Sequence, residues 1–64
     1  MKIVKEKYCI ASKSSPLMFY EEGEEYDDIE DIYLTNKEDC ERELKDFDYP
    51  EEFQILKVKV TYEL

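Results

Sequence analysis

The sequence predicts one small α+β domain over residues 1–64, with an antiparallel or mixed sheet of three to four strands and one amphipathic helix packed on one face. Residues 2–12 and 53–64 alternate apolar and polar side chains with the period of a strand, whereas residues 36–47 place apolar side chains at helical spacing. Sixty-four residues cannot supply two hydrophobic cores, so a second domain is excluded. The expected order is ββ(β)αβ. The helix is expected to cover the apolar face of the sheet, because neither the helix nor the sheet can bury its apolar face alone.

The first predicted strand is residues 2–12, in which Tyr8 and Ile10 share one face. Residues 13–16, Lys-Ser-Ser-Pro, predict a turn, because proline presets its own φ and pushes the preceding residue to an extended conformation. An apolar and aromatic run resumes at residues 17–20. A hairpin closed by this turn is therefore expected.

The middle of the chain predicts a loop, a short extended segment and the helix. Residues 21–31 hold eight acids, the single glycine and no base, so repulsion between like charges predicts an acidic loop. Residues 32–34 predict a short strand or extended segment. Thr35 and Glu38 fit a capping box, and the apolar stripe that follows predicts a helix over 36–47, ended by the next proline.

Residues 53–64 carry the clearest strand pattern. We expect this strand to pair with the first one, which would place Lys5 and Lys7 near Lys57 and Lys59 on the face opposite the helix. Lysines in such a position protect an exposed sheet from edge-to-edge aggregation. The alternative is a small stripe that binds phosphate or acidic groups.

No catalytic or metal-binding constellation is present, so we expect no enzymatic activity, no metal and no cofactor. The chain has no histidine, and the thirty residues between Cys9 and Cys40 match no zinc-ligand spacing. Both cysteines fall at apolar positions and are expected to be reduced core thiols, with a disulfide as the alternative. A calcium site in the acidic segment is disfavoured, because its spacing does not fit the EF-hand loop.

The charge of the chain is large and segregated. Eighteen acids against nine bases give a net charge of −9, so direct binding to nucleic acid or to an anionic membrane is not expected. Residues 21–52 carry a net charge of −13, and the flanking residues 1–20 and 53–64 together carry +4. The absence of a long apolar run and of a signal-peptide pattern predicts a cytoplasmic protein.

The acidic segment is the candidate binding surface. Carboxylates at alternate positions of an extended chain lie ~6–7 Å apart, of the order of the spacing between backbone phosphates, so this surface can compete with nucleic acid for a basic groove. Tyr26 is expected to be the main exposed anchor, Tyr49 the second, and Tyr33 to be packed. A purely solubilising role is the alternative. The candidate partner-binding residues are Glu21, Glu22, Glu24, Glu25, Tyr26, Asp27, Asp28, Glu30, Asp31 and Tyr49.

The chain combines a strand-rich start, a Glu/Asp-rich centre and a close that runs from Phe-Asp-Tyr-Pro-Glu-Glu-Phe at 47–53 to Thr-Tyr-Glu-Leu at 61–64. In size, acidity and layout it resembles the small early proteins of bacteriophages and mobile elements, including anti-CRISPR and other anti-defence inhibitors. The resemblance implies a DNA-mimicking inhibitor in the cytoplasm of a bacterial host, bound to a basic nucleic-acid-binding protein such as a CRISPR effector nuclease. Two other hypotheses stay open: a small assembly module that forms a homodimer or binds a partner through a sheet edge, and an antitoxin-like partner of a basic toxin.

Overall fold

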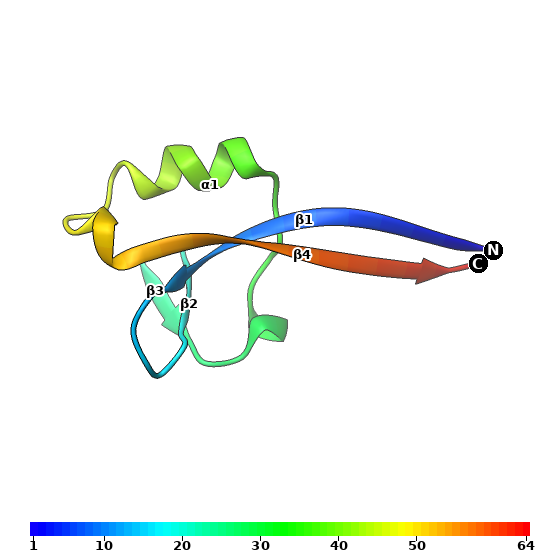
Figure 1. Cartoon of the computed structure of the whole chain (residues 1–64), viewed down its shortest axis with the longest axis horizontal. Helices are drawn as coiled ribbons and strands as arrows, with labels where there is room; N and C mark the ends of the chain where they lie inside the picture. Colours follow the sequence, from blue (N-terminus) through cyan, green and yellow to red (C-terminus); the bar gives the residue numbers. More distant parts are fainter.

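The computed structural model describes all of residues 1–64 and has the α+β class expected from the sequence (Figure 1). A four-stranded antiparallel sheet has the order β3-β2-β1-β4. No helix in the structure has the length and apolar character needed to cross a membrane. In chain order the elements are β1 (Lys2–Ser12), β2 (Phe19–Glu21), β3 (Glu24–Tyr26), the 3₁₀ turn η1 (Ile29–Asp31), α1 (Lys37–Leu44), the 3₁₀ turn η2 (Pro50–Glu52) and β4 (Phe53–Glu63).

β1 and β4 pair over their whole length, which confirms that the first and last strands are neighbours. In this register Lys5 lies opposite Val60, whereas Lys57 lies opposite Tyr8. Directly opposed residues share a face of the sheet, and successive residues alternate between faces. The predicted cluster of four lysines on one face is therefore wrong. The register splits them into Lys5 and Lys7 on one face and Lys57 and Lys59 on the other.

One face of the sheet is covered by α1, which packs against β1 and β4. Ile10 of β1 and Cys40 of α1 are the largest fully buried side chains, each 1% exposed. At the end of the helix the rings of Tyr20, Phe47 and Phe53 meet edge to face, with centroids 4.7 to 6.3 Å apart. Such pairs contribute about 0.5–1.5 kcal/mol each beyond their buried area.

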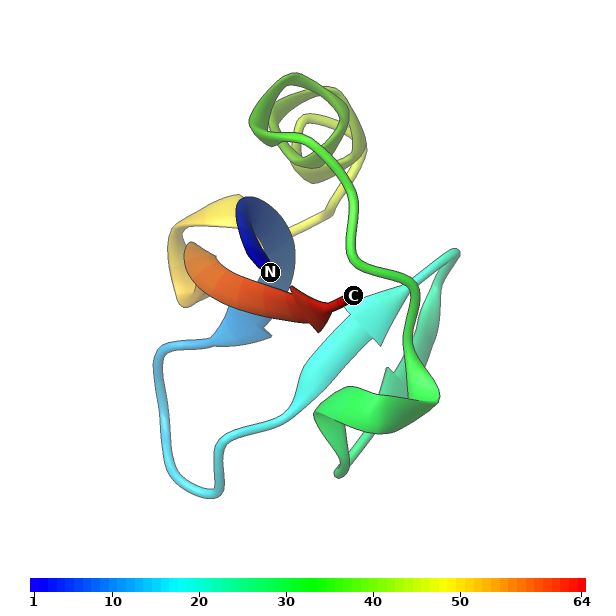
Figure 2. The ribbon, with the colours of Figure 1, turned by 90° about the vertical axis from the view of Figure 1, so that its right-hand side faces the viewer.

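The opposite face is covered by the chain between β3 and α1, which the sequence did not predict. Cys9, Ala11 and Phe19 of the sheet form a buried cluster with Ile32, and Ile29 packs against it. The core is thus two thin layers on either side of β1 rather than one layer under the helix. Figure 2, which looks at the tip of the β1–β4 ribbon, shows α1 and η1 on different sides of that ribbon.

The predicted acidic loop is ordered. β2 and β3 form a hairpin around the two-residue turn Glu22–Gly23, in which both residues have positive φ, 50° and 81°. This combination is typical of the type I′ turns that close two-residue hairpins. Residues 32–34 form no strand, but the predicted alternative of an extended segment agrees with the extended backbone of Ile32, and β3 is the third strand of the sheet.

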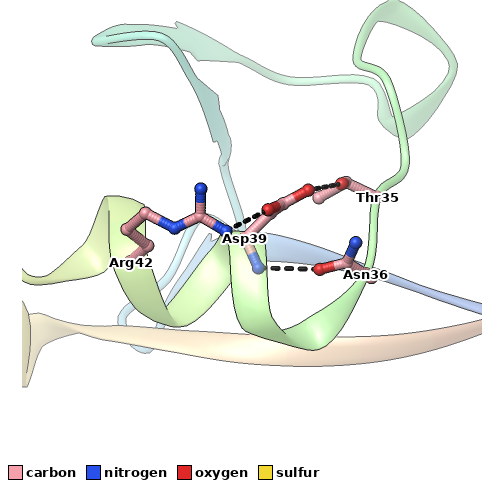
Figure 3. Close-up of polar contacts among 4 residues, drawn as sticks. All are labelled: Thr35, Asn36, Asp39 and Arg42. Carbon is pink, nitrogen blue, oxygen red and sulfur yellow. Dashed lines mark hydrogen bonds and ion pairs between the residues drawn. The ribbon is translucent and has the colours of Figure 1, made fainter.

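The helix begins one residue later than predicted. Thr35 is held extended by the sheet, because its N–H and C=O pair with Tyr8 at 2.9 and 2.7 Å. Asn36 therefore becomes the N-cap, and its side-chain oxygen accepts the N–H of Asp39 at 2.8 Å (Figure 3). The Asp39 carboxylate accepts the Thr35 hydroxyl at 2.9 Å and pairs with Arg42 at 2.6 Å. The predicted capping box between Thr35 and Glu38 is therefore wrong, because Asn36 and not Thr35 is the N-cap.

The helix also ends early, at Leu44. The N–H groups of Asp46 and Phe47 bond to carbonyls three residues back, each at 3.1 Å. Such i→i+3 bonds tighten the last turn of a helix. The tight turn brings the Phe47 ring to Tyr20, and the predicted boundary at residue 47 is corrected.

Beyond the covered part of the sheet, β1 and β4 continue as a two-stranded arm, which we define as residues 1–6 and 59–64. The arm projects from the rest of the chain, with both chain ends together at its tip (Figure 1). The Leu64 N–H donates to the Met1 carbonyl at 2.8 Å, and the molecule measures 43 × 23 × 17 Å. All arm side chains are exposed except Val60, which is half-buried.

Candidate functional site

Nine of the ten predicted partner-binding residues form one continuous unit, residues 21–31, which we call the acidic hairpin. It contains the end of β2, the turn, β3 and η1. Seven of its eight carboxylates are exposed, and Glu21 is half-buried. Tyr49, the tenth residue, lies between α1 and η2 and is 63% exposed.

Three carboxylates hold the acidic hairpin in place by accepting backbone N–H groups. Glu21 accepts the N–H of Tyr33 at 2.7 Å, and Glu43 of α1 accepts the N–H of Glu22 at 2.9 Å. Asp28 caps η1 through an N–H bond of 2.9 Å. Hydrogen bonds with one ionised partner are stronger than neutral ones, so they define the shape of this surface. The side chains of Glu22, Asp27, Glu30 and Asp31 make no hydrogen bond or ion pair within the chain.

Two of the tyrosine predictions are reversed. Tyr26, the expected exposed anchor, lies opposite Phe19 and packs half-buried against the core cluster. Its hydroxyl donates to Glu24 at 2.9 Å, and this hydrogen bond, followed by desolvation and the nearby carboxylates, raises the pKa of Tyr26. Tyr33, expected to be packed, is 86% exposed. The exposed tyrosines are therefore Tyr33 and Tyr49.

Like charges face each other within the acidic hairpin. Glu21 and Glu24 are directly opposed across β2 and β3. Like charges directly opposed across two strands destabilise a sheet. Next to it the Tyr20 hydroxyl donates to Glu25 at 3.2 Å, and the pKa of Tyr20 is raised by burial first and by Glu25 second. A cation from another molecule would relieve this crowding of negative charge.

An aromatic depression of about 290 Å³ lies beside the acidic hairpin. Its apolar lining consists of Tyr20, Phe47, Phe53 and Tyr49, and Gly23 of the hairpin turn borders it. Asp48 and Glu52 add negative charge to the same lining. The structure thus joins Tyr49 to the acidic hairpin. Phe47 and Phe53 were not predicted to line a surface, although both flank the acidic Asp-Tyr-Pro-Glu-Glu stretch.

The carboxylates of the central region are almost entirely free of ion pairs. Residues 21–52 contain sixteen acids, and only Asp39 forms a salt bridge, to Arg42. The two other salt bridges join β1 to β4: Lys2 to Glu63 and Lys57 to Glu6, both at 3.9 Å. The negative charge of the acidic region is therefore available to another molecule.

Both cysteines are free and buried. Burial raises the pKa of Cys9, and burial together with neighbouring negative groups raises the pKa of Cys40 to about 11. The thiolate is the reactive form of cysteine, so both thiols are poorly suited to nucleophilic chemistry at neutral pH. No group of three or more Cys, Asp or Glu side chains is placed to hold a metal ion.

Comparisons with known proteins return no match, either among protein-family models or among curated proteins and solved structures.

Proposed function

We propose that this chain is a non-enzymatic inhibitor that binds through the acidic hairpin to the basic nucleic-acid groove of a host defence or DNA-processing protein. A CRISPR effector nuclease is the target class that the resemblance of the sequence suggests. The observation that carries the proposal is that none of the eight carboxylates of the acidic hairpin forms an ion pair within the chain, although they lie on an ordered surface.

An ordered acidic surface is an advantage, because a disordered acidic tail loses conformational entropy when it binds and its affinity is lower for that reason. Here the acidic hairpin is tied to the helix by Glu43 and to the following segment by Glu21. Its carboxylates are therefore presented in one arrangement before binding. Opposite charge steers the encounter and increases the association rate.

The aromatic depression supplies the second element of the interface. Binding energy concentrates in a few apolar or aromatic anchors surrounded by polar groups. A depression lined by Tyr20, Phe47, Tyr49 and Phe53 with Asp48 and Glu52 fits an arginine, whose planar cation stacks on rings and pairs with carboxylates. Arginine is abundant in grooves that bind phosphate backbones.

Two charge variants with the same net charge test the proposal against a purified CRISPR effector nuclease. The first neutralises the free carboxylates of the acidic hairpin: Glu22→Gln, Asp27→Asn, Glu30→Gln and Asp31→Asn. The control neutralises four exposed carboxylates on and after the helix: Glu38→Gln, Glu41→Gln, Asp46→Asn and Glu51→Gln. Each set changes the net charge from −9 to −5.

The hairpin variant is expected to bind at least tenfold more weakly, about 1.4 kcal/mol, and the control less than threefold. An excess of duplex DNA should relieve the inhibition of DNA cleavage. The inhibition should also weaken as the salt concentration rises to the physiological value, where the Debye length falls to ~8 Å. Tyr49→Ala should reduce affinity without reducing stability. Equal loss in the two charge variants would mean that the charge acts only through its total. Full inhibition by the hairpin variant would refute the proposal.

A second candidate function, an assembly module that acts through a sheet edge, is favoured by a separate observation. β4 is the last strand of the sheet, and no other strand pairs with its outer edge. An unpaired edge is a template for another strand.

A further inference from the structure

We propose that the outer edge of β4 pairs with β4 of a second copy of this chain, in an antiparallel register whose two-fold axis passes through Val60. This inference rests on the second candidate function above and is independent of the acidic hairpin. It joins the two sheets into one, in the order β3-β2-β1-β4-β4-β1-β2-β3. The contact is isologous, which is the commonest geometry of homodimers.

The backbone groups that face outward follow from the pairing with β1. Leu64 donates its N–H to Met1, and the pattern of bonded and non-bonded pairs alternates along an antiparallel ladder. On β4 the even-numbered residues therefore bond to β1, and the odd-numbered ones direct their N–H and C=O outward. The contact of Tyr8 with Thr35, on the far side of β1, agrees with this alternation. The outward residues on the distal half of β4 are Lys57, Lys59, Thr61 and Glu63.

Charge selects the register among the two-fold arrangements. An axis at Lys59 would place two lysines opposite each other, and an axis at Val58 would place Lys57 opposite Lys59 of the second copy. The axis at Val60 instead sets Lys57 opposite Glu63 of the second copy, and Lys59 opposite its Thr61. An axis at Thr61 retains a Lys–Glu pair but shortens the ladder and leaves Lys57 without a partner.

The Val60 register extends the ion pairs already present in each chain. Lys2 lies near Glu63 and Glu6 near Lys57, each at 3.9 Å and on the same face. Pairing Glu63 with Lys57 of the second copy produces a row of alternating charge across four strands. Opposed pairs of opposite charge stabilise a sheet, whereas like charges destabilise it.

The opposite face of the arm becomes an apolar stripe in the same register. Val60 meets Val60 of the second copy, Val58 meets Tyr62, and Leu56 meets Leu64. In the single chain Tyr62 is 46% exposed and Leu64 is 75% exposed. Pairing the edges covers part of this apolar surface.

The arm also keeps the acidic regions apart. Residues 7–58 carry sixteen acids and six bases, so two such bodies repel each other. With the axis at Val60 their centres lie roughly 30 Å apart along the strands, from a rise of ~3.3 Å per residue. That separation exceeds the Debye length of ~8 Å at physiological salt. The projecting arm therefore permits self-association of a chain with a net charge of −9.

A cysteine cross-link tests the register directly, because both native thiols are buried. In a non-hydrogen-bonded antiparallel pair the Cα atoms are about 4.5 Å apart, within the range of a disulfide. Under mild oxidation with oxidised glutathione, Val60→Cys should form a covalent dimer at least tenfold faster than Val58→Cys. The two thiols at position 58 would be ~13 Å apart by strand rise. Equal rates for the two variants would overturn the register.

Two proline variants test the edge itself by measuring mass as a function of concentration in sedimentation equilibrium. Thr61→Pro removes an outward N–H of β4, whereas Val4→Pro, its cross-strand partner, removes an outward N–H of β1. Neither substitution removes a bond between β1 and β4. Thr61→Pro should raise the dimer dissociation constant at least tenfold, and Val4→Pro should leave it within threefold. A wild-type chain with the 7.8 kDa mass of a monomer up to millimolar concentration would overturn the proposal and leave this edge for a strand of another protein.

Discussion

Truncation of Ile10 is expected to remove a large part of the stability of this protein. Ile10 is 1% exposed and lies in β1, which pairs with β2 on one side and β4 on the other. The helix α1, whose Cys40 side chain is also fully buried, packs against β1. Because strands on both sides hold the backbone, the space left by a smaller side chain cannot close. A domain of this length has roughly 3–10 kcal/mol of stability, from 0.05–0.15 kcal/mol per residue.

The expected losses are about 0.5–1.5 kcal/mol for Ile10→Val and about 2–5 kcal/mol for Ile10→Ala. With an m-value of about 1 kcal/mol/M, Ile10→Val lowers the urea midpoint by about 1 M and Ile10→Ala lowers it by about 2–5 M. The measurement is far-UV circular dichroism in urea, at a protein concentration at which the chain is monomeric.

Val4→Ala is the matched control, because Val4 lies on the same strand and the same face but in the arm, where it is 58% exposed. Its cost should stay within about 0.5 kcal/mol. If Val4→Ala destabilises the monomer as much as Ile10→Val does, then stability does not come mainly from the side chains buried under α1, and the description of the arm as exposed is wrong. If Ile10→Ala remains fully folded with an unchanged midpoint, the position of the core under α1 is wrong.

Three further predictions concern other parts of the chain. Because the folded-state pKa of Cys40 is raised from 9.0 to about 11, its thiol contributes stability below about pH 9 that is lost as the pH rises to about 11. The urea midpoint should therefore fall more over this range in the wild type than in Cys40→Ala, and equal slopes would contradict the assignment. Glu24→Gln should raise the free energy of unfolding by roughly 0.2–1 kcal/mol, the scale of cross-strand pair energies, because it removes the like charge opposite Glu21 while the amide oxygen can still accept the Tyr26 hydroxyl; a urea titration that shows destabilisation would contradict this. Ser12→Ala should cost about 1–3 kcal/mol, because the Ser12 hydroxyl, 6% exposed, accepts the Met18 N–H at 3.0 Å; a thermal midpoint equal to that of the wild type would show that water replaces this bond.

The elements that the sequence predicted well are those with a strict local period. The bounds of β1 agree with the predicted residues 2–12, and β4 begins at Phe53 as expected. The turn before β2 was predicted because proline and serine act through their immediate neighbours. The same local evidence placed Cys9 and Cys40 in the core, where both are found.

The elements that were missed depend on contacts between distant residues. Repulsion between like charges predicted a loop at residues 24–26, but pairing with β2 and burial of Tyr26 outweigh that repulsion. Tyr33 is exposed because Glu21 holds its backbone while its ring points away from the core cluster. The helix began one residue late because Thr35 is paired with the sheet.

The sequence by itself determined the fold class, the extent of the two long strands, the burial of the cysteines and the large negative charge of the centre, because each depends on composition or on a period of two to four residues. Only the tertiary structure decided which carboxylates are free, which tyrosines are exposed and which strand edge is open. These properties arise from the register of β1 against β4 and from the packing of residues 27–34 on the sheet, and both join residues far apart in the chain. The physical reason is that strand pairing and side-chain alternation act across the sheet, so a shift of one residue would move every side chain to the other face.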